Sequence, residues 1–570
     1  MKRFTIAAAV VIATMLLSTS LVAQPQVKFL AAGSSAMFNT LAYAADKVNS
    51  DGYVLCGSNT TGNLWSAGKN GDNGPYILDS RDGAIPHEQG DLWVAWDGAA
   101  DGSTAQKICA MISVDSAVGV RAALATPGAT LFIPSGLKGT LGQKKVTGID
   151  DSTVTLPNNI YAALNGATIG VAATDVRPED AKWATVRALT TLGDAVSDPN
   201  PTNNGTVGSI FQYVKGLGYA SSNANIGVTI QSSKSSTGAT PVNFALYGKD
   251  PFGSNPAVST SWSTIPVGAA PVIVAANTNT GSAFAAPGCN NVNIAGLCGV
   301  LDGSFTNSAD ICGGASGSTL VTFLREPLSG TYNTMEYSGP ASYQCYSTQE
   351  KGVDPSNNNP LGGTYASGNT GRFRAIGTSE MVKAIRDSVN SIGYAFWGYG
   401  NFSSSNTGGH EQYLTIDNVD PLFDNPTSRG NGTGTSVPGS AYTFPVQNGD
   451  GTYPYISFPN VANGSYRIWT TYRLLTANSS YYDWAKLFAT VAQNDQIYKV
   501  FSDFVPMSQM KVFHDHYYTA NIGAQNILNG YSCANYYETG GDAGGLVYTC
   551  QQEADYEAAN ANAMITGKHQ

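Results

Sequence analysis

One short segment near the middle of the chain constrains the fold most. Residues 318–324 are an apolar, β-rich run that predicts a buried strand, so Arg325 lies where that strand ends. Shortly afterwards, Ser329, Gly330 and Thr331 can start a helix. A hydroxyl, a glycine that lets the backbone come close and the N–H groups of a helix N-terminus together form an anion cradle, and a guanidinium adds a planar two-pronged donor. The segment therefore predicts a site for a tetrahedral oxyanion.

The spacing Arg-x-x-x-Ser-Gly-Thr over residues 325–331 resembles the signature of phosphate-specific ABC-transporter substrate-binding proteins, which have the type 2 periplasmic-binding-protein fold. The resemblance implies two α/β lobes, joined by a hinge, that close on a ligand in the cleft between them. It implies inorganic phosphate or a related oxyanion as the ligand and an ABC-transporter membrane component as the partner. We therefore predict a two-lobed α/β fold with inserted β-rich or irregular loops.

The N-terminus has the pattern of a secretory signal peptide. Lys2 and Arg3 precede an apolar run over residues 6–17, and small residues lead to a cleavage site near Ala23. No other run approaches the roughly 20 apolar residues that a membrane helix needs. We expect residues 1–23 to be removed and the product to be soluble and exported, either periplasmic or extracellular.

The length of 570 residues allows more than one hydrophobic core. An apolar run over residues 264–277 predicts a strand that crosses into the second lobe, and residues 465–475 predict the strand that returns. We expect residues 24–263 to form the first part of lobe 1, with insertions, and residues 264–460 to form lobe 2. Residues 461–570 would then return to lobe 1 and form a C-terminal extension.

Composition narrows the function further. Only 12% of the residues are charged, and loss of Lys2 and Arg3 with the signal peptide lowers the formal net charge from −10 by two, to −12. An acidic chain is a poor nucleic-acid binder. Its global field also repels anions, so an anion site has to work through local dipoles and hydrogen bonds. The family resemblance implies a binding protein without a cofactor, and we predict a monomer that is not an enzyme.

An even number of cysteines in an exported chain favours disulfides, although eight cysteines allow ~105 pairings. We favour local bridges, for example between Cys533 and Cys550. The cysteines form no CxxC pairs, which argues against zinc, and no metal is predicted. The eight are Cys56, Cys109, Cys289, Cys298, Cys312, Cys345, Cys533 and Cys550.

A second anion cradle is predicted near the start of lobe 1. Residues 27–32 predict a strand, Gly33, Ser34 and Ser35 form a small-residue turn, and the pattern becomes helical from Ala36. The family resemblance covers this stretch, because its members begin with a strand, a turn that carries a hydroxyl, and a helix. An ordinary serine N-cap is the alternative.

Two further candidates follow in lobe 1. Ser116 lies at a strand-to-helix turn that corresponds to the Gly-Ser-Ser-Gly-Gly turn of the family, but Asp115 occupies a neighbouring position and the register stays open. Asp175 ends a strand, as does the family's Ala-Ser-Asp, whose aspartate accepts the proton of hydrogen phosphate. A carboxylate repels a dianion unless the ligand brings a proton, so Asp175 fits HPO₄²⁻ and does not fit sulfate. Capping of the next helix is the alternative for Asp175.

Four other segments carry predictions about local structure. Leu301, Asp302 and Gly303 resemble the family's segment that opens a short helix before the arginine strand. Thr378, in a turn before an amphipathic helix, lies near the ligand or simply caps the helix. Residues 126–158 predict an inserted hairpin arm. Residues 401–460 are polar and rich in Gly, Asn and Pro, which predicts a long surface excursion.

Two other classes of function stay open. His514, Asp515 and His516 could serve a hydrolase, although only two of these side chains would share a face of a strand. A structural or adhesive surface protein that reuses the fold would make Arg325 a structural arginine. Under the leading hypothesis the ligand-binding residues are Ser34, Ser35, Ser116, Asp175, Arg325, Ser329, Gly330 and Thr331.

Overall fold

The computed structural model describes residues 24–46, 54–57, 64–67, 92–99, 101–126, 128–133, 135–139, 155–176, 229–231, 243–247, 262–313, 317–325, 329–339, 349, 371–375, 377–398, 402, 410–425, 442–445, 454–514 and 547–549. The predicted signal peptide and the proposed Cys533–Cys550 bridge lie outside the described residues. Both stay predictions.

Lobe 1 is built around β1 (Gln26–Ser34). This strand pairs in parallel with β4 (Lys107–Val114) on one side and with β8 (Val171–Thr174) on the other. β3 (Leu92–Trp96) and β2 (Leu64–Ala67) extend the β4 edge in antiparallel order. Because both parallel neighbours of β1 come later in the chain, the strand order reverses at β1. The carboxyl ends of β1, β4 and β8 meet there, which is where open α/β sheets bind ligands.

Successive side chains of β1 point to opposite faces of the sheet, and each face is covered by its own cluster of buried residues. Phe29 and Ala31 belong to one buried cluster, which includes Phe488, while Leu30 and Ala32 belong to a second cluster on the other face. Phe29 stacks on Phe488 with 4.0 Å between ring centroids. The first cluster contains residues of α2 (Phe38–Asp46) and α14 (Ser479–Ala492), and the second contains residues of α3 (Ser116–Leu124). Burial on both faces accounts for the continuous apolar run of the strand.

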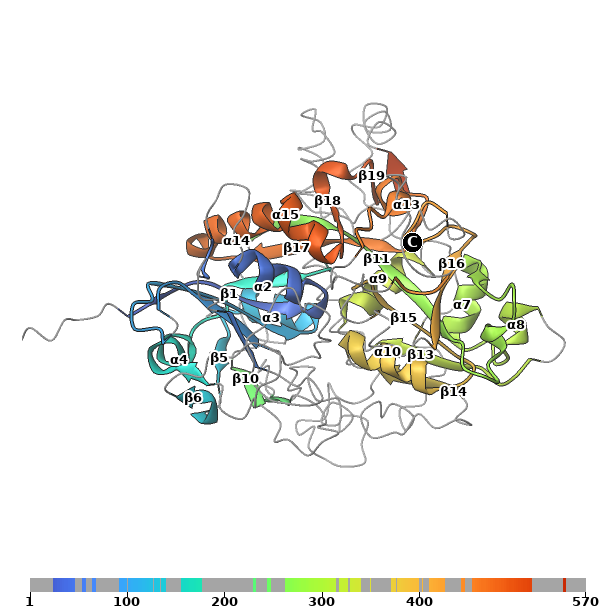
Figure 1. Cartoon of the computed structure of the whole chain (residues 1–570), viewed down its shortest axis with the longest axis horizontal. Coiled ribbons are helices and arrows are strands. Elements are labelled where there is room, and N and C mark those ends of the chain that lie inside the picture. The colour runs from blue at the N-terminus through green and yellow to red at the C-terminus, as the bar shows by residue number, and fades with distance from the viewer. Residues whose placement is uncertain are drawn as a thin grey trace, which may run out of the picture.

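The two lobes share one long strand, β11 (Ser263–Asn277). Its first half pairs in antiparallel order with β17 (Trp469–Thr476), which in turn pairs with β8. Its second half pairs with β15 (Ser391–Phe396) and β16 (Glu411–Ile416). Figure 1 shows β11 and β17 running between the blue half of the molecule and the green and yellow half.

Lobe 2 repeats the parallel arrangement around β13 (Val321–Arg325). This strand lies between β14 (Gly371–Ala375) and β15, and it pairs in parallel with both. α9 (Gly330–Ser338) follows β13 in the chain, and α10 (Gly377–Asp387) follows β14. The carboxyl end of β13 is therefore the point in lobe 2 that corresponds to the end of β1 in lobe 1.

The α/β fold class with two lobes is confirmed by this topology. Thirteen of the described strands, from both lobes, join through β11 into one sheet. The division at residues 263 and 460 stays a prediction. The remaining elements are η1 (Ser35–Met37), β5 (Thr130–Phe132), η3 (Ser135–Leu137), β6 (Lys138–Gly139), β7 (Leu156–Pro157), α4 (Asn158–Leu164), β9 (Thr229–Gln231), β10 (Asn243–Tyr247), η8 (Ala283–Ala285), β12 (Asn291–Val292), α7 (Ile294–Asp302), α8 (Ala309–Cys312), α13 (Pro459–Ala462), α15 (Asp495–Phe501), β18 (Val505–Pro506), η11 (Met507–Gln509), β19 (Val512–His514) and β20 (Val547–Thr549).

Three predictions about elements are wrong. Leu301 and Asp302 end α7 and do not open a helix, because Gly303 takes the left-handed conformation (φ 77°) that terminates helices. Residues 401–460 are not only a surface excursion, since β16 lies within them and pairs with β11. Residues 126–158 do not form a hairpin in their described part, because β5 pairs with β10 and β6 pairs with β7 in parallel.

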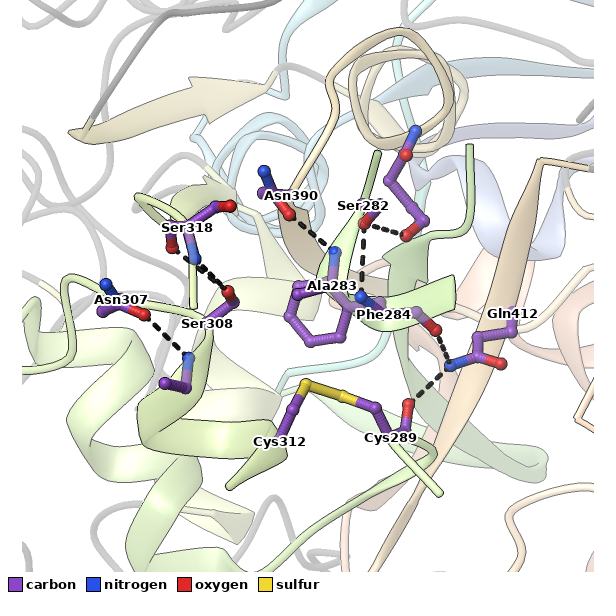
Figure 2. Close-up of a disulfide and its surroundings, with 12 residues drawn as sticks. Ser282, Ala283, Phe284, Cys289, Asn307, Ser308, Cys312, Ser318, Asn390 and Gln412 are labelled. Carbon is purple, nitrogen blue, oxygen red and sulfur yellow. Dashed lines mark hydrogen bonds between the residues drawn. A yellow bond between two sulfur atoms is a disulfide. The ribbon is translucent and has the colours of Figure 1, made fainter. Parts of the chain in front are cut away.

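Two disulfides are present among the described residues. Cys56 and Cys109 join the segment after α2 to β4, with 5.8 Å between Cα atoms. Cys289 and Cys312, 4.9 Å apart at Cα, join the segment after η8 to the end of α8. Figure 2 shows the second bridge beside Gln412 of β16, whose amide donates to the carbonyls of Phe284 and Cys289. These bridges fit the prediction of a disulfide-containing protein.

Candidate functional site

Arg325 is held at the carboxyl end of β13 by three hydroxyls. Its Nη1 donates to Thr331 Oγ1 (3.1 Å) and to Thr378 Oγ1 (3.4 Å), and its backbone N–H donates to the Tyr394 hydroxyl (3.2 Å). The side chain is 3% exposed. These contacts fix the plane of the guanidinium beside the first turns of α9 and α10. For Thr378 the sequence offered helix capping as the alternative, and that alternative did not foresee the contact with Arg325.

The hydroxyl of Ser329, at the start of α9, does not cap the helix. Ser329 is the N-cap residue and is buried, but its side chain makes no capping hydrogen bond. Its carbonyl instead accepts the Asn333 side-chain amide at 2.7 Å. Gly330 and Thr331 form the first turn of the helix. The predicted strand before Arg325 and the predicted helix start at Ser329 are thus confirmed, while their role in ligand binding stays a hypothesis.

The predicted strand and helix start of the second cradle lie at the end of β1, where η1 and α2 follow the strand, and their role in anion binding stays a prediction. The Ser34 hydroxyl accepts the Ala36 backbone N–H (3.3 Å) and donates to Asp175 Oδ2 (3.3 Å), so Ser34 both caps η1 and contacts a site carboxylate. Ser35 is buried in η1. Gly33 has φ 146°, and a Cβ there would collide with the Ala173 carbonyl of β8. Glycine therefore allows β1 and β8 to end side by side.

Asp175 lies directly after β8 and is fully buried. Thr470 of β17 donates its hydroxyl to the Asp175 carbonyl at 3.0 Å. Burial raises the pKa of the carboxyl to about 6, and the opposing influences include a hydrogen bond from Ser116 and the charge of Arg325. Asp175 Oδ1 is buried without a hydrogen-bond partner within the described part of the chain. The helix that Asp175 would cap under the alternative hypothesis lies outside the described residues.

The two lobes touch at Gly330 and Asp175. A Cβ on Gly330 would collide with the Asp175 carboxylate, so only glycine lets α9 of lobe 2 come this close to the end of β8 in lobe 1. α10 of lobe 2 also contacts η1 of lobe 1. The structure therefore brings together the two groups of candidates that the sequence assigned to separate lobes.

Asp115 is a member of this cluster that sequence reasoning missed. It is the N-cap residue of α3, but its side chain makes no capping hydrogen bond. Asp115 Oδ1 instead lies 3.7 Å from Arg325 Nη2, and both side chains are at most 3% exposed. Ser116 begins α3 beside it and hydrogen-bonds Asp175. Asp115 and Ser116, between which the sequence left the choice open, therefore both face the site. The sequence signal for Asp115 was an acidic residue directly after a parallel strand.

Tyr472 of β17 is a second residue that the sequence did not single out. The β17 and β8 register pairs Arg473 with Thr174, so Tyr472 comes opposite Asp175. Burial, followed by the charges of Asp175 and Asp503, raises the pKa of the Tyr472 hydroxyl well above its ordinary value. The hydroxyl is neutral near pH 7 and has no hydrogen-bond partner among the described residues.

No group of three or more His, Cys, Asp or Glu side chains within the described residues could hold a metal ion. No helix in the described part is long and apolar enough to cross a membrane. Of the proposed hydrolase residues, only the backbone of His514 at the end of β19 is described.

The fold and this cluster define a two-lobed α/β protein with buried polar groups from both lobes at the carboxyl ends of its parallel strands. No family model matches the chain, and no curated protein matches it in sequence. Several solved structures are similar to it at low TM-score.

One is a high-affinity periplasmic phosphate-binding protein bound with phosphate, at 13% identity and TM-score 0.33, with 85% of this chain and 90% of that one covered. Another is a phosphate-binding protein from Stenotrophomonas maltophilia, at 11% identity and TM-score 0.31, with 70% and 83% covered. A third is an ABC-type phosphate transport receptor from Vibrio cholerae, at 14% identity and TM-score 0.25, with 42% and 70% covered. At these TM-scores the site has to be interpreted from its own residues.

Proposed function

We propose that this chain is an exported solute-binding protein that captures inorganic phosphate, or a similar tetrahedral oxyanion, between its lobes. The observation that carries the proposal is the meeting of Arg325 from lobe 2 with Asp175 from lobe 1 across the Gly330 contact. The guanidinium supplies charged donors, and the carboxylate supplies the acceptor for a ligand proton. In this role the protein is a monomer that delivers its ligand to an ABC-type membrane component and performs no catalysis.

The other candidate residues complete the coordination. Ser34, Ser35 and Ser116 would contribute hydroxyls and helix N–H groups from lobe 1, and Ser329, Gly330 and Thr331 would contribute the same from lobe 2. Charged hydrogen bonds contribute roughly 1.5–3 kcal/mol each and neutral ones about 1 kcal/mol. Several such bonds make sub-micromolar affinity physically reachable after the costs of association.

Export is supported by the two disulfides, since such bonds persist in oxidising compartments. The N-terminal pattern over residues 1–23 supports it independently.

A second candidate function is that of a structural or adhesive surface protein that retains the fold without a ligand. The Asp115 contact favours it, because Asp115, Thr331 and Thr378 already surround the Arg325 guanidinium. An arginine with such partners can hold the lobes together by itself.

Titration of the purified chain with phosphate, arsenate and sulfate separates the two candidates. A binding protein releases or absorbs heat with phosphate and arsenate but not with sulfate. Phosphate at 100 times its dissociation constant should also stabilise the protein by ~2.7 kcal/mol. No heat and no thermal shift with any of the three anions would favour the structural role.

A further inference from the structure

Gln349 joins β15 to α9 inside lobe 2. It lies between α9 and β14 in the chain, and its side chain is fully buried. Its Oε1 accepts the hydroxyl of Tyr394 in β15. Its Nε2 donates to Glu336 Oε2 (3.0 Å) and to the Tyr332 carbonyl (3.2 Å), both in α9. An amide has both an acceptor and donors, so this one side chain can serve the strand and the helix at once.

The neighbours of this amide set its orientation. A backbone carbonyl only accepts hydrogen bonds, so the Tyr332 carbonyl requires the Nε2 group, and Oε1 is left for Tyr394. The hydroxyl that donates to Oε1 in turn accepts the backbone N–H of Arg325 at 3.2 Å. The hydrogen bonds therefore run in one direction, from Arg325 through Tyr394 to Gln349 and on to α9. Bonds in such a chain strengthen one another.

Both ends of this chain of hydrogen bonds act on Arg325. At one end, the bond from the Arg325 backbone N–H holds the last residue of β13 against Tyr394. At the other end, Gln349 holds α9 at Tyr332. The residue before Tyr332 is Thr331, whose hydroxyl accepts from Arg325 Nη1 at 3.1 Å. Movement of Gln349 would therefore shift both the strand end and the helix turn that orient the guanidinium.

The backbone of Gln349 is anchored away from the site. Arg372 of β14 donates its Nη2 to the Gln349 carbonyl (2.6 Å) and to the carbonyl of Leu301 in α7. Gly303, at the end of α7, leaves room for the arginine, because a Cβ there would lie 2.6 Å from Arg372 Cδ. Gln349 is thus tied to two outer elements of lobe 2 while its side chain reaches the residues beside Arg325.

On the basis of the proposed function, we propose that Gln349 is a positioning residue of lobe 2, which holds the end of β13 and α9 so that the Arg325 guanidinium is oriented before the anion arrives. Such preorganisation lowers the ordering cost of binding. In this role Gln349 does not contact the anion. Its loss should therefore weaken the binding of phosphate and arsenate alike.

Gln349→Leu tests this role, because leucine is similar in size and makes no side-chain hydrogen bonds. Calorimetric titration of the full chain with inorganic phosphate should give a dissociation constant about tenfold higher than that of the wild type. Gln412→Leu is the matched control in lobe 2, since the Gln412 amide donates to the carbonyls of Phe284 and Cys289. The control should bind phosphate within about twofold of the wild type. Equal affinities in the two variants would overturn the proposal.

Tyr394→Phe tests the path from Gln349 to Arg325, because it removes the hydroxyl between them with little change in volume. Its affinity for phosphate should also fall, and the double variant with Gln349→Leu should lose less than the product of the two single losses, as for residues of one hydrogen-bond network. Losses that simply multiply would contradict this path. If Gln349→Leu does not fold, wild-type affinity in Tyr394→Phe would overturn the proposal.

Hydrogen exchange of the Arg325 backbone N–H, followed by NMR without any anion, measures the positioning itself. In Gln349→Leu this N–H should exchange about tenfold faster relative to the N–H of Phe323 in the same strand, and Gln412→Leu should leave the ratio unchanged. An unchanged ratio in Gln349→Leu would overturn the proposal. A faster exchange at Arg325, combined with no heat from phosphate or arsenate in the wild type, would support the positioning of Arg325 and overturn the proposed function.

Discussion

In both lobes, parallel strands end beside helix N-termini, but the charged side chains at these strand ends are acidic in lobe 1 and basic in lobe 2. In lobe 1, the carboxyl ends of β1, β4 and β8 present Ser34, Asp115 and Asp175. In lobe 2, the end of β13 presents Arg325, beside the first turns of α9 and α10. Helix N-termini on both sides supply similar donors, so the difference between the lobes lies in the charged side chains.

Under the proposed function, this difference would make each lobe insufficient by itself. Lobe 1 without Arg325 would offer carboxylates that repel an anion, and lobe 2 without Asp175 would lack the acceptor that distinguishes phosphate from sulfate. Selective capture would then need both lobes.

The largest effect should follow from removing the proton acceptor of lobe 1. Asp175→Asn replaces an obligate acceptor with a group that can also donate, so the preference for phosphate over sulfate should fall by about 10⁴-fold. Titration with both anions measures the ratio of the two dissociation constants. An unchanged ratio would remove the discriminating role from Asp175.

Removing the cation of lobe 2 should weaken every anion alike. Arg325→Ala removes the guanidinium that lies 3.7 Å from Asp115 Oδ1, and truncating one partner of a buried charge pair costs about 2–5 kcal/mol. We expect affinity for phosphate to fall about 10³-fold, without a gain in preference for sulfate. Arg325→Lys, which keeps the charge and loses the planar geometry, should recover only part of the loss. Wild-type affinity in Arg325→Ala would contradict the role of the guanidinium.

The buried carboxylate of Asp175 should also destabilise the protein when no ligand is bound. Burial raises the pKa of Asp175 from its ordinary value of 3.8 to about 6 in the folded protein, so the folded state holds the proton more tightly and stability rises as the pH falls through this window. The difference corresponds to roughly 3 kcal/mol at pH 7. Asp175→Asn should therefore raise the thermal midpoint at pH 7.5, and the gain should vanish by pH 4.

The exposed Asp101 is the control for this stability effect, because Ser103 lowers its pKa. Asp101→Asn should give no such gain at pH 7.5. A gain of equal size at both positions, or a gain for Asp175→Asn that persists at pH 4, would argue against burial of the charge as the cause.

The smallest effect should come from separating the lobes by one methyl group. In Gly330→Ala the Cβ would collide with the Asp175 carboxylate, and overpacking of this kind costs typically 1–3 kcal/mol. The lobes can open to relieve it, so phosphate affinity should fall about 30-fold while the thermal midpoint without ligand changes little. Gly136→Ala, which meets no atom within 4 Å, is the control. Equal affinities in the two variants would place the ligand away from this contact.

Most of the fold was predictable because its strands are apolar and carry clear turn signals. The strands that became β1, β11, β13 and β17 were all predicted from runs of apolar residues. β16 was missed because its polar Asn- and Gly-rich neighbours obscure a six-residue strand whose position depends on pairing with β11. The end of α7 was misjudged although Gly303 is a common helix terminator.

The positions of the candidate residues at strand ends were predictable, but the contact between Asp115 and Arg325 was not. Arg325 and Asp175 followed from motifs at strand ends, yet no local pattern says that Asp115 turns away from the N-terminus of α3 toward a guanidinium of the other lobe. Tyr472 became visible only through its register opposite Asp175. Contacts between residues so distant in the chain depend on tertiary packing, which a single sequence does not display.

The most direct test is to locate an oxyanion in crystals of the protein grown with arsenate, using the anomalous scattering of arsenic. The account predicts a single strong peak between Arg325 and Asp175, with arsenate oxygens within hydrogen-bonding distance of the guanidinium and of the carboxylate. A peak elsewhere, or no peak while Arg325 keeps its contact with Asp115, would contradict it.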